Sequence, residues 1–205
     1  MVEGRSFSFR IAVIGDSTVG KSSIMEKFTK SGLKSRSFGA NFVSFEKKIG
    51  GDRIRLGFFD ITGPYYLNPS RRFLFGHKQA AIIVCSLEDT EQGEASILHV
   101  PDWHAEILKY SGDIPLYLFA NKVDLVDNVE LFDARMKTLV EEYNFKDYYY
   151  TSVQAGQNVI KAFNDIIMEL YNKFKDLPPE PTYSPRVIKE KKNWRKKKRF
   201  RYTQS

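Results

Sequence analysis

The chain has 205 residues, 42% of them hydrophobic, so it is long and apolar enough to bury one sizeable core. No apolar run approaches the roughly 20 residues of a membrane-spanning helix. The first residues, MVEGRS, lack an apolar signal core, so we expect neither a membrane-spanning nor a secreted protein. The formal net charge of +7 belongs to the C-terminal end, because residues 178–205 hold ten Lys/Arg and two Glu.

Apolar runs and helical patterns alternate along the body of the chain. Six runs predict strands, at residues 9–14, 41–49, 53–60, 79–87, 116–120 and 148–151. Patterns typical of helices cover residues 21–30, 102–110, 129–143 and 159–174. Gly50, Gly51 and Asp52 form a turn signal that joins the second and third runs into an antiparallel hairpin. This alternation predicts an α/β fold, with a six-stranded, mostly parallel sheet, one antiparallel edge strand and helices on both faces.

The most specific motif is GDSTVGKS, residues 15–22, which fills every fixed position of the phosphate-binding pattern G-x-x-x-x-G-K-[ST]. It follows a predicted strand and precedes a predicted helix, which is the context that the pattern requires. A glycine-rich loop of this kind turns backbone N–H groups toward phosphate at a helix N-terminus. Lys21 would add positive charge at the β- and γ-phosphates, and the Ser22 hydroxyl is a hard oxygen ligand for Mg²⁺. The alternative is a glycine turn followed by a surface lysine.

A weaker motif, D-x-x-G, follows the third predicted strand at Asp60 and Gly63. Ligands of such folds bind beyond the carboxyl ends of the strands, so we expect Asp60 beside the phosphate loop. There its carboxylate can hold the hydration shell of Mg²⁺. Gly63 lets a backbone N–H approach a terminal phosphate closely.

The ends of the last two predicted strands carry residues suited to a guanine base. The motif NKVD occupies residues 121–124, and the Asp124 carboxylate can accept the paired N–H donors of a guanine edge. The stem of Lys122 can pack over the base, while Ser152 and Val153 are positioned to cover its other side.

In order and spacing, these motifs resemble those of the small GTPases of the Ras superfamily, and the loop IGDSTVGKSS is very similar to that of the Rab branch. The resemblance covers about residues 7–175. It implies a P-loop GTPase fold, GTP or GDP with Mg²⁺ as ligands, and a molecular switch in signal transduction or vesicle traffic. The residues that it implies for nucleotide binding are Gly15, Asp16, Ser17, Thr18, Val19, Gly20, Lys21, Ser22, Ser23, Ser37, Asp60, Gly63, Asn121, Lys122, Asp124, Ser152 and Val153. Among them, Ser22, Ser37 and Asp60 would hold the metal, and Lys21 and Gly63 would serve hydrolysis.

The second switch departs from the family pattern. The family places a glutamine directly after the D-x-x-G glycine to orient the attacking water, but this chain has Pro64 there. Proline has neither a side-chain amide nor a backbone N–H, and the neighbouring Tyr65 and Tyr66 offer only hydroxyls. We therefore expect slow intrinsic GTP hydrolysis. The alternative is a nucleotide-loaded scaffold with negligible turnover.

The first switch departs too. SFGANF, residues 37–42, resembles the family's T-I-G-V-D-F and places Ser37 at the metal-binding threonine, with Ser35 as a competing choice. The loop of residues 29–37 has no aromatic residue to stack on guanine, which predicts weaker base affinity. By resemblance, effectors, exchange factors and activating proteins would bind residues 31–45 and 63–78.

The sequence predicts a GTPase domain over residues 1–177 and a polybasic, disordered tail over residues 178–205. The tail lacks the cysteines that the family uses for prenylation, so we expect no lipid at this end. Its residues 186–202 interleave cations with aromatic side chains, which suits an anionic membrane surface. Nuclear import, loose nucleic-acid contact and a solvated tail remain alternatives, although we expect no dedicated nucleic-acid partner. We expect a cytoplasmic protein, peripheral at a membrane's cytosolic face, with a nuclear location as the alternative.

Several residue types that often serve chemistry receive structural interpretations here. Cys85 is the one cysteine, which excludes an internal disulfide, fits a reducing intracellular compartment and predicts a small buried side chain. The spacing of His77, His99 and His104 does not suit a metal, so we expect surface or packing roles. Trp103 is a predicted packing position of a helix.

Overall fold

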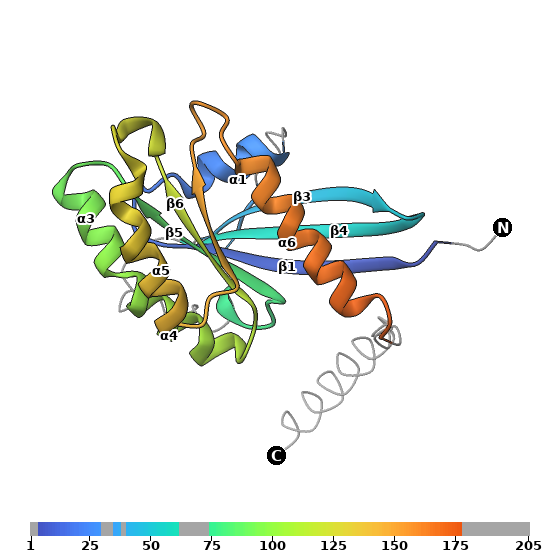
Figure 1. Ribbon diagram of the computed structural model, residues 1–205. Coiled ribbons are helices and arrows are strands. Elements are labelled where there is room, and N and C mark those ends of the chain that lie inside the picture. Colours follow the sequence, from blue (N-terminus) through green and yellow to red (C-terminus); the bar gives the residue numbers. More distant parts are fainter. Residues whose placement is uncertain (1–3, 30–34, 38–39, 62–73, 178–205) are drawn as a thin grey trace, which may run out of the picture. The chain divides into compact units, whose positions relative to one another are not determined.

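The computed structural model describes residues 4–29, 35–37, 40–61 and 74–177, with the backbone alone at residues 35–37, 40 and 41. The described strands form one sheet in the order β2-β3-β4-β1-β5-β6-β7 (Figure 1). Their bounds are β1 Ser6–Ile14, β2 Ser35–Ser37, β3 Ala40–Ile49, β4 Asp52–Ile61, β5 Ala80–Ser86, β6 Leu116–Asn121 and β7 Asp147–Thr151. The described α-helices are α1 Lys21–Thr29, α3 Glu91–Leu98, α4 Val100–Ser111, α5 Asp133–Glu142 and α6 Val159–Phe174. Two 3₁₀ turns, η2 Val123–Leu125 and η3 Val129–Phe132, complete the described elements.

The predicted α/β fold is confirmed. β3 runs antiparallel to β2 and β4, and the other neighbouring strands are parallel. Successive side chains of a strand point to opposite faces, so β1 places Ile11 in one hydrophobic cluster and Ala12 in another. α1 and α6 contribute to the first cluster, while α3, α4 and α5 contribute to the second. The sheet is therefore covered by helices on both faces.

The structure adds elements that the sequence patterns missed. β2 forms within the predicted loop before residue 40 and pairs with β3, so β3 is flanked on both sides and is not an edge strand. α3 escaped prediction because it buries only Gly93, Ser96 and Ile97, too few apolar positions for a helical stripe. Its Thr90 cap accepts a hydrogen bond from the backbone N–H of Gly93 (3.0 Å).

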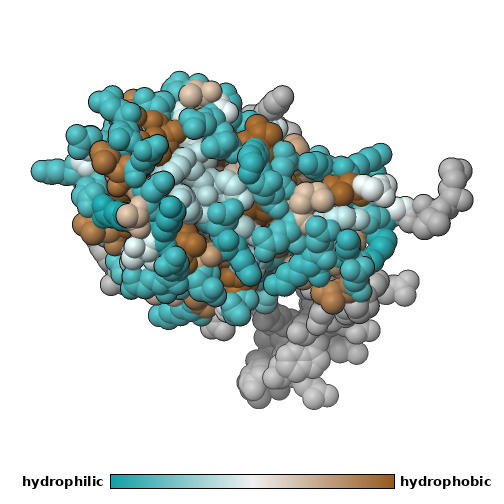
Figure 2. Space-filling model, viewed as in Figure 1, coloured by the Kyte–Doolittle hydropathy of each residue, from teal (hydrophilic) through white to brown (hydrophobic). Residues whose placement is uncertain are grey.

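The predicted helix over residues 129–143 is divided into η3 and α5 at Asp133. Cys85 is fully buried, as expected, and burial raises the pKa of its thiol to about 12. No described helix is long and apolar enough to cross a membrane. The face of the molecule shown in Figure 2 is mainly hydrophilic, with apolar side chains in small groups.

The chain divides into two compact units, residues 1–174 and 175–205. The second unit is described only through Leu177, so the predicted tail lies outside the described residues. The domain boundary at residues 177 and 178 therefore stays a prediction.

Candidate functional site: a nucleotide-binding edge of the sheet

The phosphate loop connects the end of β1 to the start of α1 and has the backbone of an anion cradle. Gly15, Thr18 and Gly20 have positive φ angles of 138°, 67° and 99°. A Cβ atom on Gly15 would lie 2.2 Å from the Val84 carbonyl oxygen, and one on Gly20 would lie 2.4 Å from Asn121 Nδ2. Both glycines are therefore required by close packing as well as by backbone conformation.

Lys21, the first residue of α1, points back into this loop. Its side chain is 3% exposed, and Nζ donates a hydrogen bond to the Asp16 carbonyl oxygen. Burial lowers the pKa of Lys21 to about 8, although the nearby carboxylates of Asp60 and Asp16 act in the opposite direction. A buried cation at a helix N-terminus is suited to phosphate oxygens.

Ser22 and Asp60 come together as predicted from their positions at the ends of neighbouring elements. The Ser22 hydroxyl donates to Asp60 Oδ2, and the Asp60 side chain is buried. A hydroxyl and a carboxylate beside a phosphate cradle are hard oxygen donors, the set that Mg²⁺ prefers. The residues present therefore fit a nucleotide with its magnesium ion.

Asn121 joins the NKVD motif to the phosphate loop. Its Nδ2 donates to the Val19 carbonyl oxygen (2.8 Å), and its Oδ1 accepts from Thr151 Oγ1 (3.1 Å). The backbone carbonyl oxygen of Asn121 accepts from the backbone N–H of Leu87 (2.9 Å). The side chain is 2% exposed, so one buried amide connects the phosphate loop with the ends of β6 and β7.

The other residues that the sequence assigns to a guanine base lie at the same edge. Lys122 has a left-handed backbone with φ of 65°, and its Nζ forms an ion pair with Glu88 Oε2 (2.6 Å). This acidic partner was not predicted. Asp124 lies in η2 and is exposed. Ser152 is buried, and its hydroxyl accepts from the backbone N–H of Ala155 (2.9 Å).

Val153 is partly buried and packs against the first hydrophobic cluster, to which α1 and α6 contribute. Some predicted positions cannot be placed. Gly63 and Pro64 lie outside the described residues, as do the side chains of Ser35 and Ser37.

Two site residues were interpreted from sequence as ordinary packing positions. Trp103 does pack in the core, at 8% exposure, but its Nε1 also donates to Asp16 Oδ1 (2.7 Å). His99 Nδ1 lies 2.7 Å from Asp16 Oδ2. Both carboxylate oxygens of a phosphate-loop residue are thus held by α4 and its N-cap. Because 83 and 87 positions separate the partners, no local pattern indicated this contact.

We expect Trp103→Phe to accelerate nucleotide dissociation by about 3- to 10-fold. A hydrogen bond to a charged group is worth about 1.5–3 kcal/mol, but this one holds Asp16 of the phosphate loop, so only part of its loss affects the bound nucleotide. Phenylalanine retains much of the packing but has no N–H donor. Release of a fluorescent guanine nucleotide measures the rate. In an Asp16→Ala background the same substitution should have little further effect, and an equal acceleration there would contradict the role of this contact.

The lowered pKa of Lys21 predicts proton uptake on nucleotide binding. At pH 8 about half of the Lys21 side chains are neutral in the free site, and phosphate favours the charged form. Calorimetry at pH 8 in buffers of different ionisation enthalpy should therefore detect uptake of up to about half a proton per nucleotide. Affinity should fall as pH rises through 8, where the free site loses its charge. Lys21→Arg, which remains charged, should abolish the uptake, and uptake unchanged in that variant would assign the proton elsewhere.

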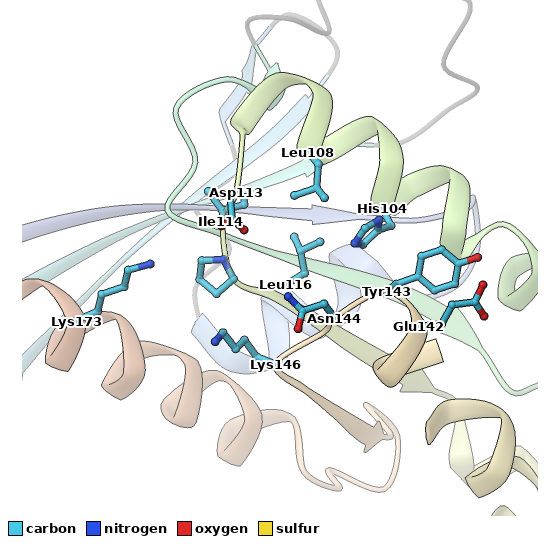
Figure 3. A pocket seen from close by; sticks show the side chains of 11 residues that line it. His104, Leu108, Asp113, Ile114, Leu116, Glu142, Tyr143, Asn144, Lys146 and Lys173 are labelled. Carbon is cyan, nitrogen blue, oxygen red and sulfur yellow. The ribbon is translucent and has the colours of Figure 1, made fainter. Parts of the chain in front are cut away.

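A separate surface pocket of about 360 Å³ lies at the other end of β6 (Figure 3). Pro115 and Leu116, at the start of that strand, contribute to its wall, whereas Asn121 ends the strand. Side chains of both charges surround it, including Asp113 and Lys173. This pocket is therefore no part of the nucleotide site, and its mixed charge favours no ligand class.

A mostly parallel sheet with a phosphate cradle between β1 and α1 defines an α/β P-loop nucleotide-binding protein. The family model described as Ras family matches residues 10–172, and the chain belongs to this family. It is a Rab-like small GTPase, so the resemblance noted from the motifs is confirmed.

The chain is 26% identical over 167 residues to Ras-related protein Rab-21 of Bos taurus, covering 80% of this chain and 73% of that protein. It is 28% identical over 173 residues to Ras-related protein Rab-19 of Rattus norvegicus, covering 82% and 77%. It is also 28% identical over 176 residues to Ras-related protein Rab-30 of Homo sapiens, covering 82% and 83%. Membership supports guanine-nucleotide binding with Mg²⁺, GTPase activity and switch function at the level of the family.

Proposed function

We propose that this chain binds GTP or GDP with Mg²⁺ at the edge formed by the phosphate loop, Asp60 and the NKVD motif. The observation that carries the proposal is the hydrogen bond from Asn121 Nδ2 to the Val19 carbonyl oxygen, because it links phosphate and base recognition. The backbone of residues 15–23, with Lys21, would hold the phosphates. Asp124 would select guanine, with Lys122, Ser152 and Val153 around the base.

The metal would be held by Ser22, Asp60 and Ser37, where it neutralises phosphate charge. Gly63 would offer a backbone N–H to the terminal phosphate in the GTP state. Effectors and regulators would bind residues 31–45 and 63–78, by analogy with the family. For the tail, we propose contact of residues 186–202 with an anionic membrane, because about 1 kcal/mol accompanies each basic residue near such a surface. This would make the protein peripheral at the cytosolic face of a membrane, in keeping with the vesicle-trafficking role of Rab-like proteins.

Hydrolysis is proposed to be slow. Attack of water on the γ-phosphate needs positive charge at the phosphates, which Lys21 supplies, and a group that orients the water. Pro64 offers no amide for that second task. Positioning carries most of the catalysis in this reaction, so a chain that holds GTP without positioning water would remain in its GTP state for long periods. A partner protein would then supply the missing group. The second candidate, also favoured by Pro64, is a nucleotide-loaded scaffold that scarcely turns over.

The decisive experiment identifies the nucleotide that co-purifies with the full chain and follows its γ-phosphate over hours. We expect bound GTP to convert slowly, and Pro64→Gln to raise the rate by about tenfold or more. Lys21→Ala provides the background, because phosphate release that survives this change comes from a contaminant. Wild-type release as fast as that of an active relative would contradict the proposal. GTP that stays intact in both wild type and Pro64→Gln would select the scaffold.

A further inference from the structure

The amino-terminal half of β1 and the adjoining hairpin of β3 and β4 expose a polar face on one side of the sheet. Every second side chain points to this side, and the register places three residues in each row across the strands. The rows are Lys48–Arg53–Ser6, Glu46–Arg55–Ser8 and Ser44–Gly57–Arg10, and the side chains in them are exposed apart from the partly exposed Gly57. Figure 1 shows the ends of these strands reaching toward the right of the view, beyond α6, which crosses them.

This basic sheet face, defined by Arg10, Lys48, Arg53, Arg55 and Glu46, carries four cations and one carboxylate, a net charge of +3. Glu46 is shared, because Arg53 Nε lies 3.2 Å from its Oε1 and Arg55 Nε lies 3.2 Å from its Oε2. One carboxylate balances only one of these two guanidinium groups. Within the described part of the chain, Lys48 and Arg10 have no ion-pair partner. The body outside the tail is nearly neutral, so this concentration of positive charge is local.

We propose that the basic sheet face binds an extended acidic segment of a protein partner. Alternate carboxylates on an extended segment are about 6.8 Å apart, which is the spacing of Arg53 and Arg55 on β4. Guanidinium groups bind carboxylates bidentately, and such pairs add geometric specificity to charge attraction. Arriving carboxylates would compete with Glu46 for both arginines.

Two other anionic partners fit this face less well. A membrane-binding face also inserts apolar or aromatic side chains, but the uncharged positions in these rows are three serines and a glycine. Single-stranded nucleic acid needs open aromatic rings for base stacking. The adjacent aromatic residues, Phe42 and Phe59, pack on each other with ring centroids 5.0 Å apart, and the Nζ of buried Lys78 lies 4.1 Å from the centroid of Phe59.

The test uses the full chain loaded with GDP and an eight-residue peptide of alternating Glu and Thr. Amide shifts of Ser8, Lys48 and Gly57 in NMR titrations report this face separately from the basic tail. We expect the amide shifts of these residues to saturate as peptide is added. Arg55→Glu should lower the affinity for the peptide by about tenfold or more. Lys137→Glu makes the same charge change on exposed α5 and should leave the shift intact.

Removing the Glu46 carboxylate, which competes with the peptide for both arginines, should strengthen peptide binding. Glu46→Gln should tighten peptide binding by about threefold, and raising salt should weaken binding in every variant. A peptide with the same composition but its Glu residues in one block should bind less well. Equal binding of both peptides would overturn the spacing argument.

No shift at these strands, or equal losses with Arg55→Glu and Lys137→Glu, would overturn the proposal. Tighter, Arg55-dependent binding of a single-stranded oligonucleotide or of phosphatidylserine vesicles would replace the acidic segment with that partner. The face lies at the opposite end of β1 from the phosphate loop, with Arg10 roughly 13 Å along the strand from Ile14. Binding should therefore be equal with GDP or a GTP analogue, and its failure would leave the nucleotide proposal intact.

Discussion

Asp124→Asn should lower GTP affinity by about 100-fold or more and create affinity for xanthine nucleotides. In the proposed pose the carboxylate accepts two N–H donors of guanine, and each hydrogen bond to a charged group is worth about 1.5–3 kcal/mol. An amide replaces one acceptor with a donor, which opposes the guanine N–H groups but matches the carbonyl oxygen of xanthine. Affinities for GDP and XDP, measured by calorimetry on one preparation, give both changes.

Asp127→Asn is the matched control for this substitution. Asp127 is also exposed, three residues further along the chain, and its replacement makes the same change in net charge. We expect its affinity for guanine nucleotide to remain at the wild-type value. Loss of GDP binding in Asp124→Asn with no gain for XDP would count against the assignment of the base, while leaving the phosphate site standing.

Phe163→Ala should destabilise the domain by about 3–5 kcal/mol, a large part of the roughly 5–15 kcal/mol that keeps a domain folded. The ring is fully buried on α6, and it stacks on Phe28 with centroids 4.4 Å apart. Phe58 and Phe119 contact it edge-on at 5.1 and 5.7 Å. Alanine would leave a cavity that these large neighbours cannot fill without losing their own contacts.

Ile160→Ala tests whether the loss of stability comes from the buried position of Phe163 rather than from placing alanine in α6. Ile160 lies on the same helix with 39% exposure, so its truncation should change stability by about 0.5 kcal/mol or less. Urea unfolding with a fixed nucleotide concentration compares the variants, since bound nucleotide itself stabilises the fold. Similar midpoints for the two variants would show that Phe163 is not central to the core.

Local sequence was sufficient for the phosphate loop and for most of the sheet. GDSTVGKS specifies its own backbone, because glycines permit the positive φ angles at residues 15 and 20 and Lys21 begins the helix. The apolar runs predicted strands because their signal is also local: side-chain alternation and burial act over neighbouring residues. Two elements were missed, because local patterns report burial only where it is periodic: β2 spans three residues with no apolar side chain among them, and α3 buries few apolar positions.

By itself, then, the sequence determined which residue types stand at the strand ends: the glycine-rich loop with Lys21, the hydroxyl and carboxylate proposed to hold the metal, the Asp124 carboxylate proposed to recognise guanine, and Pro64 where the family has a glutamine. Only the tertiary structure decided how these parts are held. It brought His99 and Trp103 to Asp16, and Glu88 to Lys122. It also gathered cations from three strands on one face of the sheet. These contacts join residues far apart in the chain, and their partners are fixed by sheet order and helix packing, which no short stretch of sequence specifies.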